Sequence, residues 1–84
     1  MNRERFSELL FDALVSVAPE VRREAIDTAR PLREQVDLDS MDWLNFLLAL
    51  RDKTGVSVDE ADYGHLRSVE DLLDYIASRP QSKM

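Results

Sequence analysis

The sequence contains no cysteine, two glycines, three prolines and one histidine among its 84 residues. Without cysteine, the chain can form neither a disulfide framework nor a thiolate site. The scarcity of glycine and proline leaves few turn signals, which disfavours a β fold built from short strands. No apolar run approaches the length of a membrane span, so we expect a cytoplasmic protein without membrane insertion.

Basic residues are also in short supply, since 11 lysines and arginines face 17 acids and leave a net charge of −6. Residues 1–35 carry six arginines and seven acids, whereas residues 36–84 carry five basic and ten acidic residues. This excess of negative charge would repel phosphate backbones, which makes nucleic acid and anionic membrane poor partners. Proteins with basic surfaces are the natural complement.

The length and composition predict one small domain. Hydrophobic residues make up 44% and charged residues 33% of the chain, a balance typical of globular proteins. A chain of this size buries only about 60–65% of its unfolded surface, so it has a single small core. We expect one domain over residues 1–84, ordered at about 5–77 and frayed at 78–84, and we expect a monomer.

The apolar spacing is helical from the start of the chain. It predicts a first helix over about residues 3–17, with a buried face made of Phe6, Leu9, Leu10, Ala13 and Val17. Residues 18–36 then read as a long, mostly irregular connection, with a helical turn within 19–26 and apolar anchors at Ile26, Leu32 and Val36. Pro31 disfavours one continuous helix through this segment. A connection this long in so small a domain usually has a function.

Two more helices follow. One begins at Asp39 or Ser40, where Asp39 is a good N-cap and Asp42 gives a weak capping box, and it ends before Gly55. Residues 59–66 read as one or two helical turns. Ser68 then caps a last helix, whose buried face is Val69, Leu72, Leu73 and Ile76. The prediction is an all-α fold: a small bundle of three main helices and one short helix, with a long loop between the first and second helices.

The helix that starts near Ser40 has two apolar stripes. A wide stripe suits the core and consists of Trp43, Phe46, Leu47 and Leu50. The second, here called the outer stripe, consists of Met41, Leu44 and Leu48 and is rimmed by Asp42, Asn45, Arg51 and Asp52. A three-helix domain has difficulty covering both faces of one helix. The outer stripe is therefore either packed under the long loop or exposed for a partner, and a charged rim favours the partner.

Ser40 stands among three acids in the stretch DLDSMDWLNFLLAL, residues 37–50. The simplest interpretation is that Asp39 caps the helix and Ser40 is an ordinary residue of its first turn. The alternative is that Ser40 is a point of attachment, since the N-terminus of a helix favours a bound phosphate. The nearby acids oppose such a phosphate only weakly, because two like charges about 6 Å apart in water cost about 0.7 kcal/mol.

The residues Asp39-Ser40-Met41-Asp42 resemble the Asp-Ser-Leu-Asp motif of acyl carrier proteins in the phosphopantetheine-binding family. The resemblance covers roughly residues 5–77 and includes the apolar anchors of the long loop. It implies that Ser40 carries a 4′-phosphopantetheine arm, attached from coenzyme A by a phosphopantetheinyl transferase, with Asp39 as the motif residue and N-cap. The arm would supply the thiol that this cysteine-free chain lacks. Such a carrier holds acyl intermediates as thioesters and is not itself an enzyme.

The resemblance also implies two sets of site residues and a set of partners. The surface that docks acyl-loading and acyl-transferring enzymes would be Met41, Asp42, Leu44, Asn45, Leu48, Arg51 and Asp52. The pocket for the acyl chain would be lined by Trp43, Phe46, Leu47, Tyr63 and Leu66. No metal ligands are implied.

Several positions depart from the family pattern. Asn45 and Arg51 replace acids that are common on the docking helix, and Asp37 stands where many carriers have glycine. Trp43 and Tyr63 replace smaller residues near the pocket, where they either pack in the core or narrow the cavity. These departures favour a specialised carrier over a housekeeping one.

Three other functions compete with this prediction. A calcium loop counted from Asp37 would place Met41 at position 5, where an oxygen ligand is needed, and Asp42 at position 6, where glycine is needed. A hydrolase built on Ser40 and His65 lacks a nucleophile elbow and an evident oxyanion hole. An acidic helical adaptor without a prosthetic group stays open, because it would show the same surface.

Overall fold

A computed structural model describes residues 3–78 of the chain. The elements, in order, are α1 (Arg3–Val17), the 3₁₀ turn η1 (Arg23–Ala25), α2 (Leu32–Gln35), α3 (Ser40–Thr54), the 3₁₀ segment η2 (Glu60–His65) and α4 (Val69–Ser78). The predicted all-α fold is confirmed for these residues, and the three long helices have nearly the predicted bounds. The expected frayed tail lies, apart from Ser78, outside the described residues.

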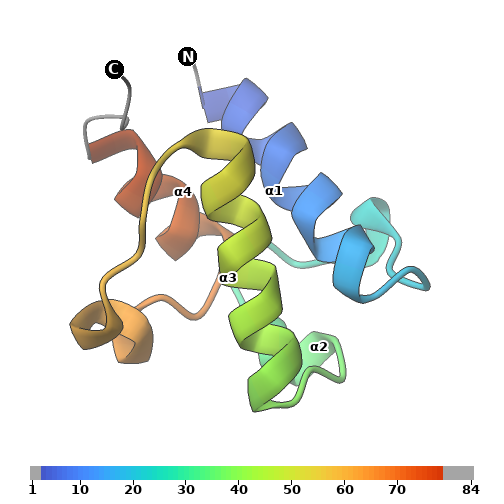
Figure 1. Cartoon of the computed structure of the whole chain (residues 1–84). Coiled ribbons are helices and arrows are strands. Elements are labelled where there is room, and N and C mark those ends of the chain that lie inside the picture. The colour runs from blue at the N-terminus through green and yellow to red at the C-terminus, as the bar shows by residue number, and fades with distance from the viewer. Residues whose placement is uncertain (1–2, 79–84) are drawn as a thin grey trace.

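Helix α1 packs against both α3 and α4, and the core lies between them (Figure 1). The predicted face of α1 is buried except at Val17, which is only half-buried. Phe11 and Leu14 of α1 are buried as well, so its apolar face is wider than the predicted stripe. The largest side chains that are fully enclosed are Phe46, Leu10, Leu14, Leu32, Leu50, Leu72, Ile76 and Val69.

Local signals at both ends fix the position of α3. The Asp39 carboxylate accepts a hydrogen bond from the backbone N–H of Asp42 at 2.8 Å, which satisfies one of the N–H groups that a first turn leaves without an acceptor. At the other end Gly55 has φ of 78°, and its N–H donates to the carbonyl of Arg51 at 2.7 Å. Glycine takes this left-handed conformation without steric cost, which ends the helix. Both predicted caps are confirmed.

Helix α4 begins with a complete capping box. The Ser68 hydroxyl accepts from the N–H of Asp71 at 3.1 Å, and the Asp71 carboxylate accepts from the N–H of Ser68 at 3.2 Å. The predicted buried face of α4 is buried throughout. Near its far end, Asp74 pairs with Arg3 at 2.7 Å, which joins α4 to the start of α1.

The connection between α1 and α3 is more ordered than the sequence predicted. The helical turn expected within 19–26 is present as η1, but α2 was not predicted. Pro31 is the N-cap of α2, with φ of −56°, so the proline does prevent a continuous helix and yet starts a short one. Leu32 is fully buried, Val36 is buried and Ile26 is half-buried, so all three predicted anchors contact the core.

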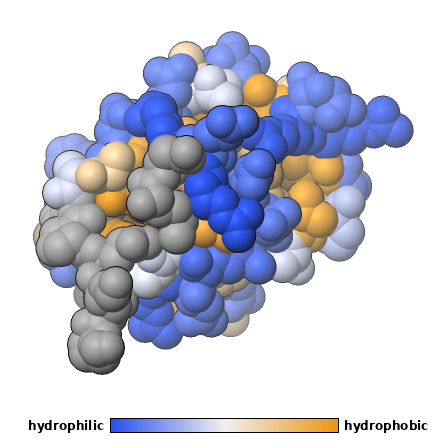
Figure 2. Space-filling view, turned by 90° about the horizontal axis from the view of Figure 1, so that it is seen from above, coloured by the Kyte–Doolittle hydropathy of each residue, from blue (hydrophilic) through white to orange (hydrophobic). Residues whose placement is uncertain are grey.

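The same connection is bound to the start of α4. Pro31 forms an isolated antiparallel bridge with Ser68, and the N–H of Leu32 donates to the carbonyl of Arg67 at 2.7 Å. The N–H of Glu70 donates to the carbonyl of Thr28 at 3.0 Å. These bonds hold the loop and α2 against the start of α4, and α2 lies near the beginning of α3 (Figure 1). Seen from above, hydrophilic residues cover most of the described surface, with small groups of hydrophobic atoms between them (Figure 2).

Candidate functional site

Ser40 is the first residue of α3 and is exposed to solvent. The first turn of a helix presents backbone N–H groups and the positive end of the helix dipole, which together favour an anionic group. Asp39, just before it, is exposed and uses its carboxylate as the helix cap. Both interpretations of Asp39, as a cap and as a motif residue, are compatible with this geometry.

The other described serines provide a comparison. Four of them use their hydroxyl groups in hydrogen bonds within the protein, namely Ser7, Ser16, Ser68 and Ser78. Within residues 3–78 no such bond involves the Ser40 hydroxyl, and the same is true of Ser57 in the loop after α3. Ser40 and Ser57 are both exposed, but of the two only Ser40 lies at the N-terminus of a helix.

The two apolar stripes of α3 separate as the sequence indicated. The core stripe is buried, from Trp43 at 8% exposure to Phe46 and Leu50 at 0%. The outer stripe is in solvent, with Met41 at 67%, Leu44 at 40% and Leu48 at 42% exposure. The long loop therefore does not cover the outer stripe, and the exposed apolar residues begin directly beside Ser40.

The rim of the outer stripe is polar. Asn45, Arg51 and Asp52 are exposed and Asp42 is half-buried. Arg51 lies 3.7 Å from the carboxylate of Asp52, with both side chains more than half exposed. This pair contributes little stability, because exposed ion pairs are worth about 0–1 kcal/mol. It does neutralise part of the acidity of the surface that α3 presents.

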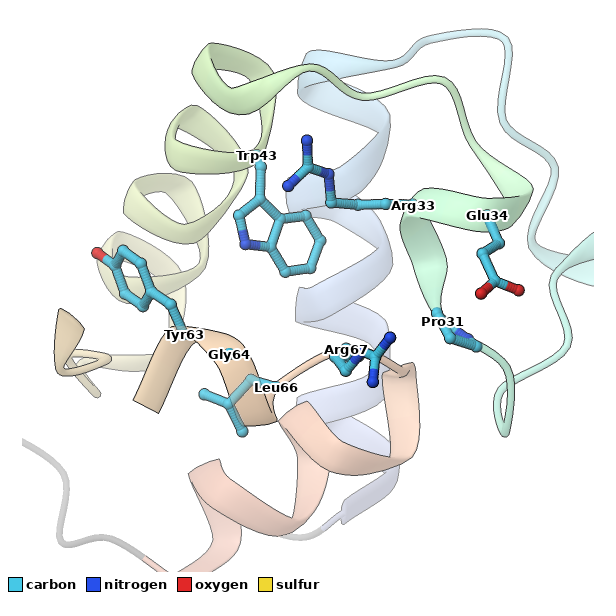
Figure 3. A pocket seen from close by; sticks show the side chains of 8 residues that line it. All are labelled: Pro31, Arg33, Glu34, Trp43, Tyr63, Gly64, Leu66 and Arg67. Carbon is cyan, nitrogen blue, oxygen red and sulfur yellow. The ribbon is translucent and has the colours of Figure 1, made fainter. Parts of the chain in front are cut away.

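A cavity of about 350 Å³ lies between α2, the beginning of α3 and η2 (Figure 3). Three of the predicted pocket residues line it: Trp43, Tyr63 and Leu66. The other two, Phe46 and Leu47, are buried in the core and do not line this cavity. The Trp43 ring lies 5.3 Å from the ring of Phe46, centroid to centroid, so the indole connects the cavity to the core.

Sequence reasoning missed the polar lining of the cavity. Arg33 and Glu34 come from α2, and Arg67 comes from the segment before α4 (Figure 3). Arg33 lies over Trp43, with its guanidinium carbon 6.0 Å from the ring centroid, and its Nε donates to the carbonyl of Leu38 at 3.1 Å. Nothing in the local pattern marks these residues, because the contact between the loop and the start of α4 brings them together.

Comparison with known proteins agrees with this geometry. Residues 8–76 match the family model described as the phosphopantetheine attachment site. The chain is 28% identical over 76 residues to an acyl carrier protein of Nitratidesulfovibrio vulgaris, covering 90% of this chain and 93% of that protein. It is 24% identical over 85 residues to the mitochondrial acyl carrier protein of Saccharomyces cerevisiae, covering 98% of this chain and 68% of that protein.

The chain belongs to the phosphopantetheine attachment family. The resemblance to acyl carrier proteins is thereby confirmed, and 4′-phosphopantetheine is the covalent cofactor of the chain. The geometry of Ser40 fits this group. Its hydroxyl is exposed at a helix N-terminus, so it can take up the pantetheinyl phosphate as a phosphodiester without breaking a hydrogen bond given for the described residues. When attached, the arm supplies the thiol that forms thioesters, and members of the family are carriers rather than catalysts.

Other features of the described residues bear on the competing functions. Among the side chains that the structure describes, no group of three or more His, Asp or Glu is placed to hold a metal ion. His65 is exposed in η2, and the hollow that it lines does not include Ser40. None of the described helices is long and apolar enough to cross a membrane. Asp37, which stands where many carriers have glycine, does not have a positive φ, since Gly55 alone among the described residues has one.

Proposed function

We propose that this chain is an acyl carrier protein in which Ser40 bears the 4′-phosphopantetheine arm. The observation that carries the proposal is the position of Ser40, exposed at the first residue of α3 and next to the exposed apolar residue Met41. The motif around it and the family match over residues 8–76 support the same assignment. In this role the chain is a substrate of partner enzymes and performs no catalysis of its own.

We further propose that partner enzymes dock on the outer stripe and its rim. Exposed apolar residues surrounded by polar ones are typical of protein interfaces. The acids around Ser40 attract basic enzymes before contact, and the outer stripe then supplies the apolar area that holds them. The expected partners are a phosphopantetheinyl transferase and enzymes that load and transfer acyl groups.

The carrier is proposed to be specialised rather than housekeeping. The surface of α3 contains Asn45 and an Arg51–Asp52 pair, so it is less acidic than the family pattern. Trp43 and Tyr63 line the cavity and take up room that a long acyl chain needs. A cytoplasmic location stays our prediction, although one relative is mitochondrial by name.

The decisive experiment is the intact mass of the protein after incubation with coenzyme A, Mg²⁺ and a broad-specificity phosphopantetheinyl transferase. We expect the unmutated chain to gain one pantetheinyl phosphate and Ser40→Ala to gain none. Ser57→Ala is the matched control, because it removes another exposed serine, and it should be modified fully. Modification of Ser40→Ala would show that the arm is attached to another residue. If the unmutated chain is not modified, the result would favour an acidic adaptor without a prosthetic group.

A further inference from the structure

Two arginines that are far apart in the sequence meet at the cavity beside Trp43. The bridge between Pro31 and Ser68, together with the bond from the Leu32 N–H to the Arg67 carbonyl, places α2 against the segment before α4. Arg33 follows Leu32, so both arginines line the same cavity, on the side opposite Tyr63 (Figure 3).

Among the side chains that the structure describes, no carboxylate pairs with the two arginines at this cavity. The contacts given for the Arg33 guanidinium are to the Leu38 carbonyl and the Trp43 ring, and the described ion pairs include neither Arg33 nor Arg67. Among the described lining residues Glu34 is the one acid, and it pairs with Arg30 at 3.8 Å. A chain with a net charge of −6 thus places two arginines around one cavity with no carboxylate partner among the described side chains.

The rest of the lining suits a short acyl group. Trp43 is buried, Leu66 is buried and Tyr63 is half-buried, so these side chains form an apolar wall. The volume of about 350 Å³ is near the lower end of ligand pockets, which span about 300–1,000 Å³. Guanidinium groups match the geometry of carboxylates and can bind them through two parallel hydrogen bonds.

We propose that this cavity selects a short acyl group that ends in a carboxylate, and that Arg33 and Arg67 bind that carboxylate. The inference rests on the proposed function, because the arm on Ser40 must deliver the acyl group. The phosphodiester of the arm is a second anion with the same chemistry, and a form that bears the arm without an acyl group separates the two.

The test compares melting temperatures of four forms of the protein at low salt: unmodified, bearing the arm alone, and bearing glutaryl or pentanoyl groups. The two acyl groups have equally long carbon chains and differ in the terminal carboxylate. We expect the glutaryl form to melt about 1–5 °C above the pentanoyl form, as one exposed ion pair would give in a domain of this size. Arg67→Gln and Arg33→Gln should each remove most of that difference. Arg22→Gln, at an exposed arginine that does not line the cavity, should keep it.

Each other outcome has a defined meaning. Equal melting temperatures for the two acyl forms, or a difference that survives both substitutions, would overturn the inference. If the arm alone already gives the full arginine-dependent shift, the arginines bind the phosphodiester and the carboxylate proposal is wrong. Arg67→Gln keeps the test decisive if Arg33→Gln unfolds, since Arg33 also bonds Leu38. A chain that gains no mass from the transferase contradicts the proposed function itself, whereas a loaded chain without a glutaryl effect contradicts this inference alone.

Discussion

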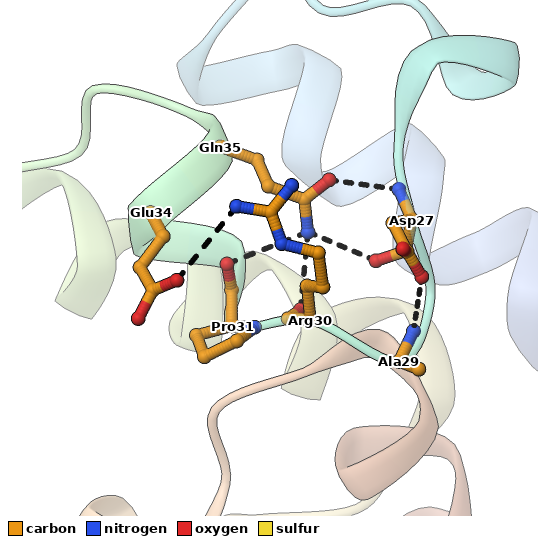
Figure 4. Close-up of polar contacts among 6 residues, drawn as sticks. All are labelled: Asp27, Ala29, Arg30, Pro31, Glu34 and Gln35. Atoms are coloured by element: carbon orange, nitrogen blue, oxygen red, sulfur yellow. Dashed lines mark hydrogen bonds and ion pairs between the residues drawn. The ribbon is translucent and has the colours of Figure 1, made fainter.

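The side chain of Gln35 binds both backbone groups of Asp27. Its Oε1 accepts from the Asp27 N–H at 2.7 Å, and its Nε2 donates to the Asp27 carbonyl at 2.9 Å (Figure 4). The same Nε2 lies 3.1 Å from the Arg30 carbonyl and 3.4 Å from the Pro31 carbonyl. One amide therefore closes the turn that leads into α2, the element that carries Arg33 to the cavity.

Gln35→Ala should loosen this turn while leaving the three long helices intact. The substitution leaves the backbone groups of Asp27 without their partner, and we expect a loss of about 1–3 kcal/mol of unfolding free energy. Glu34→Gln is the neighbouring control, because it removes only an exposed ion pair and should cost less than about 1 kcal/mol. Thermal unfolding measures both, and amide exchange at Asp27 should accelerate in Gln35→Ala alone. Equal effects of the two substitutions would contradict the role of Gln35.

The sequence allowed the long helices to be predicted because their signals are local. Asp39 and Gly55 mark the ends of α3, and Ser68 with Asp71 marks the start of α4. Each of these caps acts within a few residues of its own position, so the pattern can be recognised without knowing the fold. The buried and exposed stripes of α3 follow from the same helical period.

The parts that were not predicted depend on contacts between distant segments. Helix α2 has four residues, too few for helical propensity to stabilise alone. It is held by burial of Leu32 and by the bond from Leu32 to the carbonyl of Arg67. The same contact brings Arg33 and Arg67 to the cavity. Neither α2 nor this arginine lining could therefore be predicted from local sequence patterns.

Substitutions at Asp39 should separate its two roles. Asp39→Ala removes the acceptor for the Asp42 N–H, which should cost about 1 kcal/mol and lower the melting temperature by about 4–8 °C. Asp39→Asn keeps an acceptor but removes the charge, so its melting temperature should stay near that of the unmutated protein. If the charge steers the transferase, both variants should be modified more slowly at low salt and the deficit should shrink at high salt. A rate for Asp39→Asn equal to that of the unmutated protein would limit Asp39 to capping.

Leu48→Glu should weaken docking without unfolding the domain. Leu48 is 42% exposed, so a charged residue there costs little stability, within about 0.5 kcal/mol. Val15→Glu is the matched control, since Val15 is 41% exposed but belongs to α1 and not to the proposed docking surface. We expect the transferase to modify Leu48→Glu more slowly and Val15→Glu at the normal rate, with helix content unchanged in both by circular dichroism. Loss of structure in Leu48→Glu would place the outer stripe in the core.

The size of the cavity predicts how stability responds to the length of an uncharged acyl chain. Trp43 and Tyr63 line the cavity, and each CH₂ of an acyl chain that finds no room there forfeits about 0.8 kcal/mol of burial. The melting temperature of the unmutated protein should therefore rise over the first few carbons and then level off. A steady rise out to long chains would show that these two side chains do not block the cavity.

Trp43→Ala should make the cavity large enough for longer acyl chains. The indole is 8% exposed, so its loss should destabilise the protein bearing no acyl group by about 3–5 kcal/mol. Longer acyl chains should then restore part of the loss, because they can occupy the space that the indole leaves. Leu50→Ala is the control, since Leu50 is fully buried on the same helix but does not line the cavity. It should be destabilised by about 2–5 kcal/mol with no greater recovery from long chains than the unmutated protein shows. The measurement is the melting temperature of the three proteins as a function of acyl chain length. Parallel curves for Trp43→Ala and Leu50→Ala would show that Trp43 acts only as a core residue.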